Sequence, residues 1–387
     1  MTTPQRGFEI SEFASRCNKA QLAMAANDID ALLLTSEADI RYFTGFMTQF
    51  WQSPTRPWFV VIPLSGKPIA VIPSIGAPLM RQGYVGDIIS WASPDEDDDG
   101  ITLVADVIRQ HISKDAALGM LMGRETAVRM PLADLFALQK NLGMPLHDMT
   151  AAIQKIRMVK SPAEQAKLRY ICGIVADVFA HVPEWLRPGM PLDACFRQFK
   201  MDALERGVDD VSYLVGAAGA GGYDDIIAPP TSTPVAAADV VMFDTGCVWD
   251  GYFSDFDRNF SIGPPSQLAA DAHKTLFDAT EAALAMLRPG VTAADLFNTM
   301  DKILRPDGSA DGGDVGRYGH GLGIQLTETP SHTAWDTTEI TAGMALTIEP
   351  SISYGCGFVM VAEENLLVHD DHIELLSRRA PRELPVI

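Results

Sequence analysis

The sequence predicts a chain of two domains, an α/β domain over residues 1–155 followed by an α+β domain over residues 156–387. Three observations lead to this prediction. The 387 residues exceed the length of about 250–300 residues at which a single hydrophobic core usually divides. Short apolar runs alternate with helical patterns in the first part of the chain. A basic stretch, residues 155–160, then precedes the start of a long helix, and we place the domain boundary there.

The first domain is expected to hold a sheet with helices packed on it. Its apolar runs are bounded by proline or by polar turns, as expected for buried strands. The predicted strands cover residues 30–35, 58–63 and 68–73, and the predicted helices cover residues 13–26, 103–112 and 133–142. Alternation of the two kinds of segment is typical of the α/β class.

The second domain opens with a helix whose start is marked by three residues. Ser161 is a favourable N-cap, Pro162 occupies the first helical position and Glu164 is placed to complete a capping box. Beyond residue 240, short apolar strands alternate with two further helices, which we predict over residues 268–287 and 293–304.

Composition narrows the classes of function. Apolar residues make up 47% of the chain, as in globular proteins, and the formal net charge is −20. A chain this acidic is repelled by phosphate backbones and anionic lipid, so neither nucleic acid nor a membrane is expected as a partner. The five cysteines form no Cys-x-x-Cys pair, and no apolar run approaches the roughly 18 residues of a membrane span. We therefore expect a reduced, cytoplasmic protein.

Two aspartates give the first indication of a metal site. Asp244 lies in the apolar run 239–246, and residues 251–258, which contain Asp255, are predicted to pair with that run as a hairpin. Because side chains alternate along strands, both carboxylates could point to one face, where they would be costly without a cation between them. On these residues alone, two aspartates that flank a turn remain the alternative.

Three further residues carry chemistry that a metal could use. His320 lies among the glycines of 319–323, which leave space for close approach of a ligand, although a histidine in a glycine-rich loop is usually a plain loop residue. Glu349 closes the apolar run 345–350. Glu363 stands within the apolar run 359–368, and a divalent cation is a common partner for a buried carboxylate.

In order and in flanking sequence, these residues resemble the pita-bread metallopeptidase family of methionine aminopeptidase, aminopeptidase P, prolidase and creatinase. The matching motifs are Asp-Thr-Gly at 244–246, Ser-Asp at 254–255, Gly-His-Gly-Leu-Gly at 319–323, Thr-Ile-Glu-Pro at 347–350 and Glu-Glu-Asn-Leu-Leu-Val at 363–368. Upstream, residues 40–45 and 158–164 are similar to the two-domain prolidase and creatinase branch, so the resemblance covers nearly the whole chain.

The resemblance implies a fold, an assembly and an activity. The fold would be a creatinase-like α/β N-terminal domain plus a pita-bread C-terminal domain, with helices outside a curved antiparallel sheet, and the chain would form a homodimer through its N-terminal domain. Two divalent metal ions, manganese first and otherwise cobalt, iron or zinc, would be bound by Asp244, Asp255, His320, Glu349 and Glu363. The implied activity is that of a dinuclear metal-dependent hydrolase resembling Xaa-Pro dipeptidase and aminopeptidase P.

The sequence departs from the proline-specific relatives at three positions. Thr327 and Ile227 stand where those enzymes carry histidines, and Val361 stands where they carry an arginine. Each acid or base group contributes about 10²–10⁴-fold in rate, so we expect a changed substrate, either a small amide or a zwitterion. Beside Glu349, the residues considered as catalytic replacements are Glu328 and His332, followed by Tyr223, Asp225 and Asp257.

Two other functions remain open on the sequence. One is a metal-dependent lyase acting on a small zwitterion such as dimethylsulfoniopropionate, and the other is a non-catalytic binding protein on the same scaffold. Trp51 and Trp58 bear on the first, because a pair of indoles on a loop could cover a cationic head group in the partner's site by cation–π attraction. The alternative is that both tryptophans belong to a domain core or a dimer interface.

Overall fold

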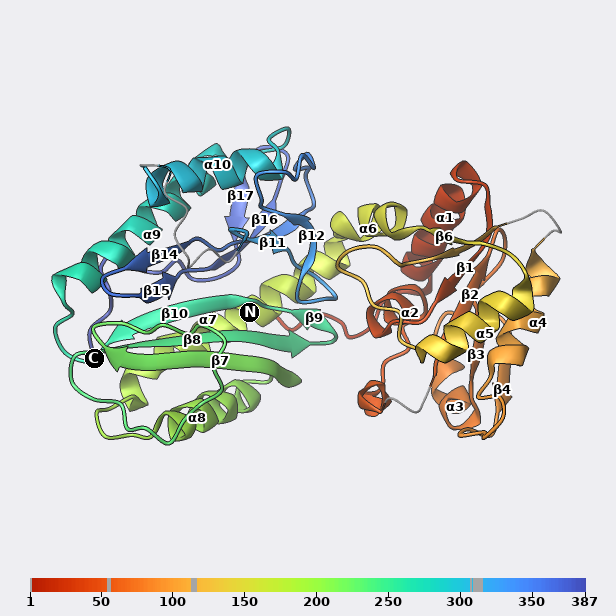
Figure 1. Cartoon of the computed structure of the whole chain (residues 1–387), viewed down its shortest axis with the longest axis horizontal. Coiled ribbons are helices and arrows are strands. Elements are labelled where there is room, and N and C mark those ends of the chain that lie inside the picture. Colours follow the sequence, from red (N-terminus) through yellow and green to blue (C-terminus); the bar gives the residue numbers. More distant parts are fainter. Residues whose placement is uncertain (1, 54–56, 113–116, 307, 309–315) are drawn as a thin grey trace. The chain divides into compact units, whose positions relative to one another are not determined.

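A computed structural model describes residues 2–53, 57–112, 117–306, 308 and 316–387 of the chain (Figure 1). The chain divides into two compact units. One comprises Gln5–Arg157, and the other comprises Met158–Ile387 together with the first residues of the chain. Among the described residues, no helix combines the length and apolar character needed to cross a bilayer.

The first unit is built on a six-stranded sheet of order β4-β3-β2-β1-β5-β6, in which β2 runs antiparallel to both of its neighbours. Its strands are β1 Ile29–Leu34, β2 Phe59–Pro63, β3 Ile69–Pro73, β4 Ile88–Trp91, β5 Ala117–Met120 and β6 Leu146–Asp148. Its helices are α1 Ile10–Ala26, α2 Glu37–Thr44, α3 Ala77–Met80, α4 Ile101–His111, α5 Leu132–Leu142 and α6 Thr150–Met158, with 3-10 turns η1 Gln49–Gln52 and η2 Ser74–Gly76. The α/β class predicted for this part of the chain is confirmed.

The tryptophans of this unit belong to its core. Trp51 and Trp58 are 8% and 1% exposed, and their ring centroids lie 6.0 Å apart. Phe46 packs against both, and a Cβ on Gly76 would come within 2.2 Å of the Trp58 ring. The suggestion that these indoles are presented on a loop to cover a ligand is therefore wrong, because both side chains are buried and packed against their neighbours. Residues 54–56 of the same segment lie outside the described residues.

The second unit combines antiparallel sheets with long helices. Its helices are α7 Pro162–Trp185, α8 Leu192–Glu205, α9 Gln267–Met286 and α10 Ala293–Leu304. Its strands are β7 Asp210–Ala220, β8 Asp239–Trp249, β9 Tyr252–Phe253, β10 Phe256–Ser261, β11 His320–Gly321, β12 Glu328–Ser331, β13 Ala345–Ile348, β14 Ser351–Tyr354, β15 Phe358–Val361, β16 Glu364–Val368 and β17 Ile373–Leu375. The three helices predicted from the sequence are confirmed, whereas α8 and β7 were not predicted.

Three sheets carry the strands of the second unit. They have the orders β10-β8-β7 with β9 paired to β8, β12-β11-β13-β16-β17, and β14-β15. Figure 1 shows α8 beside β7 and α9 beside the β14-β15 hairpin, and α10 packs against α9. Apolar residues of α9 and α10 form one core with residues of β8, β13 and β16. The first sheet carries Asp244 within β8 and Asp255 just before β10, and the second carries the other predicted metal residues in or next to β11, β13 and β16.

The start of α7 forms as the sequence predicts. The Ser161 side chain accepts a hydrogen bond from the Glu164 backbone N–H, and the Glu164 carboxylate accepts one from the Ser161 N–H in return. Glu164 also accepts a 2.8 Å bond from the Tyr252 hydroxyl, which ties the capping box to β9. The first turn of α7 is thereby fixed next to the hairpin that carries Asp255.

Candidate metal centre

Asp244 lies at the centre of a three-stranded antiparallel sheet. Its direct partners across the sheet are Val215 on β7 and Asp257 on β10, so all three side chains point to the same face. The strand pairing thus places a second carboxylate, Asp257, beside Asp244. The predicted hairpin is confirmed, with Asp255 immediately before β10.

Tyr213 links the two aspartates. Its hydroxyl lies 2.9 Å from Oδ1 of Asp244 and also contacts Oδ1 of Asp255. The ring has room because its partner in β8 is Gly246, where an added Cβ would come within 2.5 Å of the Tyr213 ring. Asp255 is held in addition by its backbone, since its N–H donates to Oδ1 of Asn365 at 2.9 Å. The two predicted aspartates therefore meet at one point.

His320 presents one ring nitrogen to the same cluster. Its Nδ1 lies 2.9 Å from the Gly321 carbonyl oxygen. Because a carbonyl oxygen only accepts hydrogen bonds, Nδ1 must carry the proton, and Nε2 is left as the ligand atom. Nε2 lies 3.4 Å from Oδ2 of Asp255 and 4.0 Å from Oε2 of Glu349. Gly319 makes this position possible, because a Cβ there would come within 2.4 Å of the Thr347 carbonyl oxygen.

Glu363 and Glu364 are adjacent but differ in their partners. Glu364 is neutralised by Arg258 at 2.9 Å and Arg379 at 3.0 Å. Glu363 is 2% exposed, and its Oε1 has no hydrogen-bond partner among the described residues. A buried carboxylate oxygen without a partner is costly, so Glu363 is the member of the pair whose environment calls for a cation.

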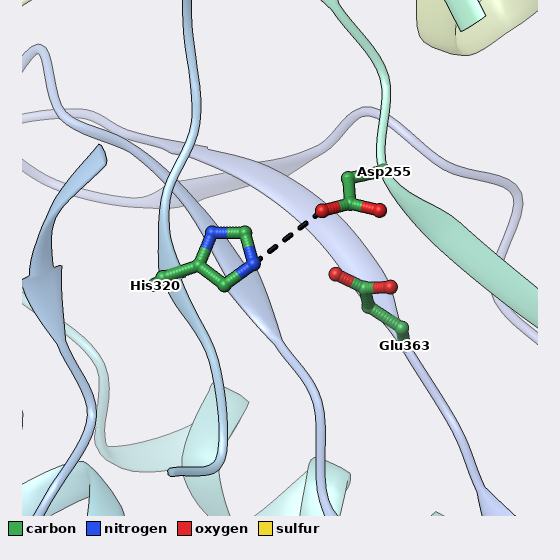
Figure 2. A group of neighbouring side chains, drawn as sticks. All are labelled: Asp255, His320 and Glu363. Atoms are coloured by element: carbon green, nitrogen blue, oxygen red, sulfur yellow. Dashed lines mark ion pairs between the residues drawn. The ribbon is translucent and has the colours of Figure 1, made fainter. Parts of the chain in front are cut away.

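Figure 2 shows Asp255, His320 and Glu363 pointing toward one another. Each offers one ligand atom, and these atoms lie within 4.8 Å of one another. An imidazole and two carboxylates at such distances can reach a common metal ion of the kinds that accept mixed oxygen and nitrogen ligands. The donors fit a divalent cation.

In the protein without metal, the pKa values of the clustered carboxyl groups also indicate a cation site. Burial, followed by the charge of Asp255, raises the pKa of Asp244 and of Glu363 well above their ordinary values. Burial raises the pKa of Glu349 to about 7. Burial also raises the pKa of Asp257, whose Oδ1 has no hydrogen-bond partner among the described residues. The cluster is short of positive charge, which metal ions would supply.

For His320, burial disfavours the charged imidazolium, but hydrogen bonding to Asp255 and the nearby carboxylate charges more than offset it. The pKa of His320 is therefore raised overall.

A cavity of 320 Å³ opens onto this cluster. Four of the five predicted metal residues line it, and Glu363 is buried behind them. The lining residues are Tyr213, Val215, Ile227, Asp244, Asp255, Arg317, His320, Leu326, Thr327 and Glu349. Thr327 and Ile227, two of the positions at which the sequence departs from the proline-specific relatives, thus face this space.

The structure places the two proposed catalytic replacements away from the cavity. His332 is fully buried, with its Nδ1 only 2.7 Å from where a Cβ on Gly319 would lie, and burial lowers its pKa to about 4. Glu328 is 6% exposed and forms an ion pair with Lys160 at 2.7 Å. Neither is among the residues that line the cavity, so a direct action of either on substrate stays a prediction.

Of the other considered replacements, two make contacts within the fold and one joins the cluster. Tyr223 is 3% exposed, and its hydroxyl donates to Oδ1 of Asn259 at 2.6 Å. Asp225 is exposed and accepts a hydrogen bond from the Ile227 N–H in its own loop. Asp257 alone among these three joins the carboxylate cluster.

Two polar residues of the cavity were missed from the sequence. Tyr213 lies on β7, where small residues weaken the alternation that would have revealed the strand. Arg317 lies three residues before His320, in a segment without apolar periodicity. Only proximity to the histidine motif could have drawn attention to it.

The fold and the cluster define a class, that of two-domain hydrolases in which a pita-bread domain binds metal. Two family models match the chain: Metallopeptidase family M24 over residues 166–370, and the Creatinase/Prolidase N-terminal domain over residues 16–159. The chain belongs to metallopeptidase family M24 and is a metal-dependent hydrolase. The fold class and family predicted from the sequence are confirmed.

Two dipeptidases and a prolidase align with almost the full length of the chain. The chain is 27% identical over 387 residues to the probable dipeptidase PepE of Mycobacterium tuberculosis. The alignment covers 99% of this chain and 98% of that protein. The solved structure of dipeptidase PepE from Mycobacterium ulcerans has a TM-score of 0.85 at 29% identity, covering 98% of this chain and 99% of that one. A prolidase from Thermococcus sibiricus has a TM-score of 0.87 at 24% identity, covering 98% and 100%.

Proposed function

We propose that the protein hydrolyses an amide bond in a small substrate such as a dipeptide, using two divalent metal ions, with manganese as the first choice. One observation carries the proposal: an imidazole and three carboxylates line one cavity, and Glu363, whose Oε1 has no partner among the described residues, groups with Asp255 and His320. The proposed ligands are Asp244, Asp255, His320, Glu349 and Glu363. The relatives named as dipeptidases support the choice of substrate.

The chain's own residues would prepare the site for this reaction. Tyr213 orients the carboxylates of Asp244 and Asp255, and Gly321 fixes the tautomer of His320. Glu349 is the group we assign to proton transfer, because its side chain is 26% exposed and lines the cavity, within reach of a small substrate. It would accept the proton of the attacking water and return it to the leaving nitrogen. Bound divalent ions would supply Lewis-acid polarisation of the substrate carbonyl.

Isotope labelling tests the reaction type. Protein stripped of metal and reloaded with manganese is incubated with a dipeptide panel and, separately, with dimethylsulfoniopropionate in water enriched in ¹⁸O. Amide hydrolysis places one solvent oxygen in the acid product, which mass spectrometry detects. An alkene product would instead establish the lyase. Full recovery of every compound after prolonged incubation with metal would contradict the proposal and favour a binding protein.

We also propose that the protein is a cytoplasmic homodimer assembled through its first domain. Family membership and the lack of any Cys-x-x-Cys pair support this. Light scattering at micromolar concentration is expected to give twice the chain mass. Truncating the exposed apolar side chains of the first domain, such as Phe50 or Phe136, then tests which surface is used. A monomer that retains full turnover would contradict the assembly.

A further inference from the structure

Thr347 and Asn365, here called the polar pair, face each other across the second sheet next to the carboxylates of the metal cluster. They are direct partners in the antiparallel register of β13 and β16, and both are fully buried. Glu349 follows Thr347 by two residues, and Glu363 precedes Asn365 by two. Because side chains alternate along a strand, the pair is expected on the same face as these glutamates. Buried polar groups need hydrogen-bond partners, and those of the pair are informative.

The Thr347 hydroxyl holds the backbone of His320. It accepts a 3.0 Å hydrogen bond from the His320 N–H. His320 begins β11, which has only two residues, and the pairing of β11 with β13 joins Gly321 to Leu346. The threonine side chain therefore extends the attachment of this short strand to the residue that carries the imidazole.

The Asn365 side chain holds the backbone of Asp255 with both ends of its amide. Its Oδ1 accepts a 2.9 Å hydrogen bond from the Asp255 N–H, and its Nδ2 donates to the Asp255 carbonyl oxygen. Because a backbone N–H only donates and a carbonyl oxygen only accepts, one orientation of the amide alone satisfies both. Asp255 lies between β9 and β10, and the pairing of β10 with β8 begins at Phe256. Asn365 thus supplies the pairing that the strand does not.

Asn365 is itself fixed from three directions. The Cys172 thiol of α7 donates to Oδ1 at 3.4 Å, the Asn365 N–H donates to Ser377 Oγ at 3.0 Å, and the Asn365 carbonyl accepts from the Leu376 N–H at 2.8 Å. The amide therefore has a defined position and orientation in the protein without metal. A side chain held in this way can order a neighbouring ligand before a cation binds.

We propose that the polar pair is a positioning device of the metal centre, which fixes the backbones of Asp255 and His320 relative to each other. These two residues come from different sheets, and their facing atoms, Oδ2 and Nε2, lie 3.4 Å apart. The pair contacts both backbones, so the loss of either contact should change how the two side chains meet a cation. This inference rests on the metal ligands of the proposed function and does not depend on the reaction.

Threonine variants test the first contact. Thr347→Val keeps the shape of the side chain and removes the oxygen that holds His320, so manganese affinity should fall about tenfold or more. Thr347→Ser keeps the hydroxyl and should bind manganese nearly as wild type does. Thr280→Val is the matched control, because Thr280 is 1% exposed and its hydroxyl donates to the Leu276 carbonyl within α9. It should keep wild-type affinity. Calorimetric titration of the metal-free proteins with manganese measures these affinities.

Asparagine variants test the second contact. Asn365→Leu leaves the Asp255 N–H and carbonyl without their partner and should weaken manganese binding about 10- to 100-fold. Asn259→Leu is the control, since Asn259 is 3% exposed and contacts the Val361 carbonyl at 2.7 Å and the Tyr223 hydroxyl at 2.6 Å. It should keep the affinity. If Asn365→Leu does not fold, the threonine variants decide the proposal.

Cobalt provides a readout that a purely structural role would not change. The visible absorption spectrum of bound cobalt responds to the arrangement of its ligands. Thr347→Val and Asn365→Leu are expected to alter the spectrum at saturating cobalt, whereas Thr347→Ser, Thr280→Val and Asn259→Leu should give the wild-type spectrum. Thermal melts of the metal-free proteins are run in parallel. All the variants that lose a buried hydrogen bond should melt at lower temperature, so a fall in stability alone does not count as support.

The outcomes separate this inference from the proposed function. If metal affinity and the cobalt spectrum depend on the polar pair but no peptide is cleaved, the hydrolase proposal fails and the positioning role stands. If peptides are cleaved while Thr347→Val keeps wild-type affinity and spectrum, the positioning role is overturned and the hydrolase stands. Equal losses in Thr347→Val and Thr280→Val would overturn it too. A wild-type protein that binds no divalent metal would overturn both.

Discussion

The adjacent residues Glu363 and Glu364 show how partners, rather than residue type, decide the role of a buried carboxylate. Both are at most 2% exposed. Glu364 has two arginines as partners, whereas Glu363 faces Asp255 and His320. The first arrangement is a buried ion network whose charges are balanced, and the second is the cluster that we propose as a cation site.

This contrast predicts opposite effects for the same substitution at the two positions. Glu363→Gln should reduce bound metal and abolish turnover, while leaving the metal-free protein as stable as wild type or more so. Glu364→Gln should keep the metal but lower the free energy of unfolding by about 3 kcal/mol, because Arg258 and Arg379 lose a buried partner. Elemental analysis and urea denaturation measure the two quantities. Normal metal content in Glu363→Gln would refute the ligand assignment.

The sequence alone could identify residues whose neighbours in the chain are distinctive. Asp244, His320 and Glu349 stand in motifs that point to a metal site. It could not identify residues that matter only through a partner in space. Tyr213 contacts Asp244, 31 positions away, and Arg317 belongs to the site only because it lines the cavity. His332 was considered because it is close in sequence to His320, and the structure places its Nδ1 2.7 Å from where a Cβ on Gly319 would lie.

Among the elements, the loop that leads into β11 is constrained by the backbone geometry of one glycine. Gly319 has a φ of +126°, and its missing Cβ leaves space filled by Thr347 and His332. Thr347 and His332 are both buried, so neither can move aside without disturbing the packing around it. The orientation of His320 therefore depends on the residue before it having no side chain.

Gly319→Ala should consequently reduce metal affinity as well as stability. Gly290→Ala is the matched control, because Gly290 has a φ of +96° with nothing within 4 Å of its added Cβ. Both variants carry backbone strain of about 1 kcal/mol, but only Gly319→Ala should displace His320, with a further loss of metal affinity of about tenfold or more. Metal titration and thermal melts measure the effects. Equal metal affinity in the two variants would show that the clash is absorbed elsewhere.

Element prediction succeeded where local chemistry decides and failed where packing decides. Ser161 and Glu164 mark the start of α7 by their own hydrogen bonds, so the helix could be placed to the residue. The strand β7 contains three alanines and two glycines, which have low strand propensity, and it forms because β8 pairs with it along ten residue pairs. Such tertiary pairing leaves little trace in the strand's own sequence.

At the scale of the whole molecule, the metal cluster couples folding to pH. In the metal-free protein, burial raises the pKa of Asp244, Asp257, Glu349 and Glu363, so the folded state keeps protons that the unfolded chain loses above about pH 4. For each extra proton that the folded state holds, the free energy of unfolding falls by about 1.4 kcal/mol per pH unit. Buried His332 acts in the opposite direction, since burial lowers its pKa to about 4 and the fold gains stability up to about pH 6.5.

The metal-dependent part of the stability isolates the cluster, because His332 contributes with and without metal. Divalent ions bind the deprotonated carboxylates, so the rise in melting temperature on adding manganese should be small near pH 4.5. It should grow steadily up to the pKa of Glu349, which burial raises to about 7. Thermal melts with and without manganese, at half-unit pH steps, measure this increment. Glu363→Gln should flatten the curve, and Glu364→Gln should lower both melts while preserving it. If the manganese-dependent rise in melting temperature became smaller as the pH increased, metal binding would not release protons from these carboxylates. The cluster would then be a structural feature that folds without a cation.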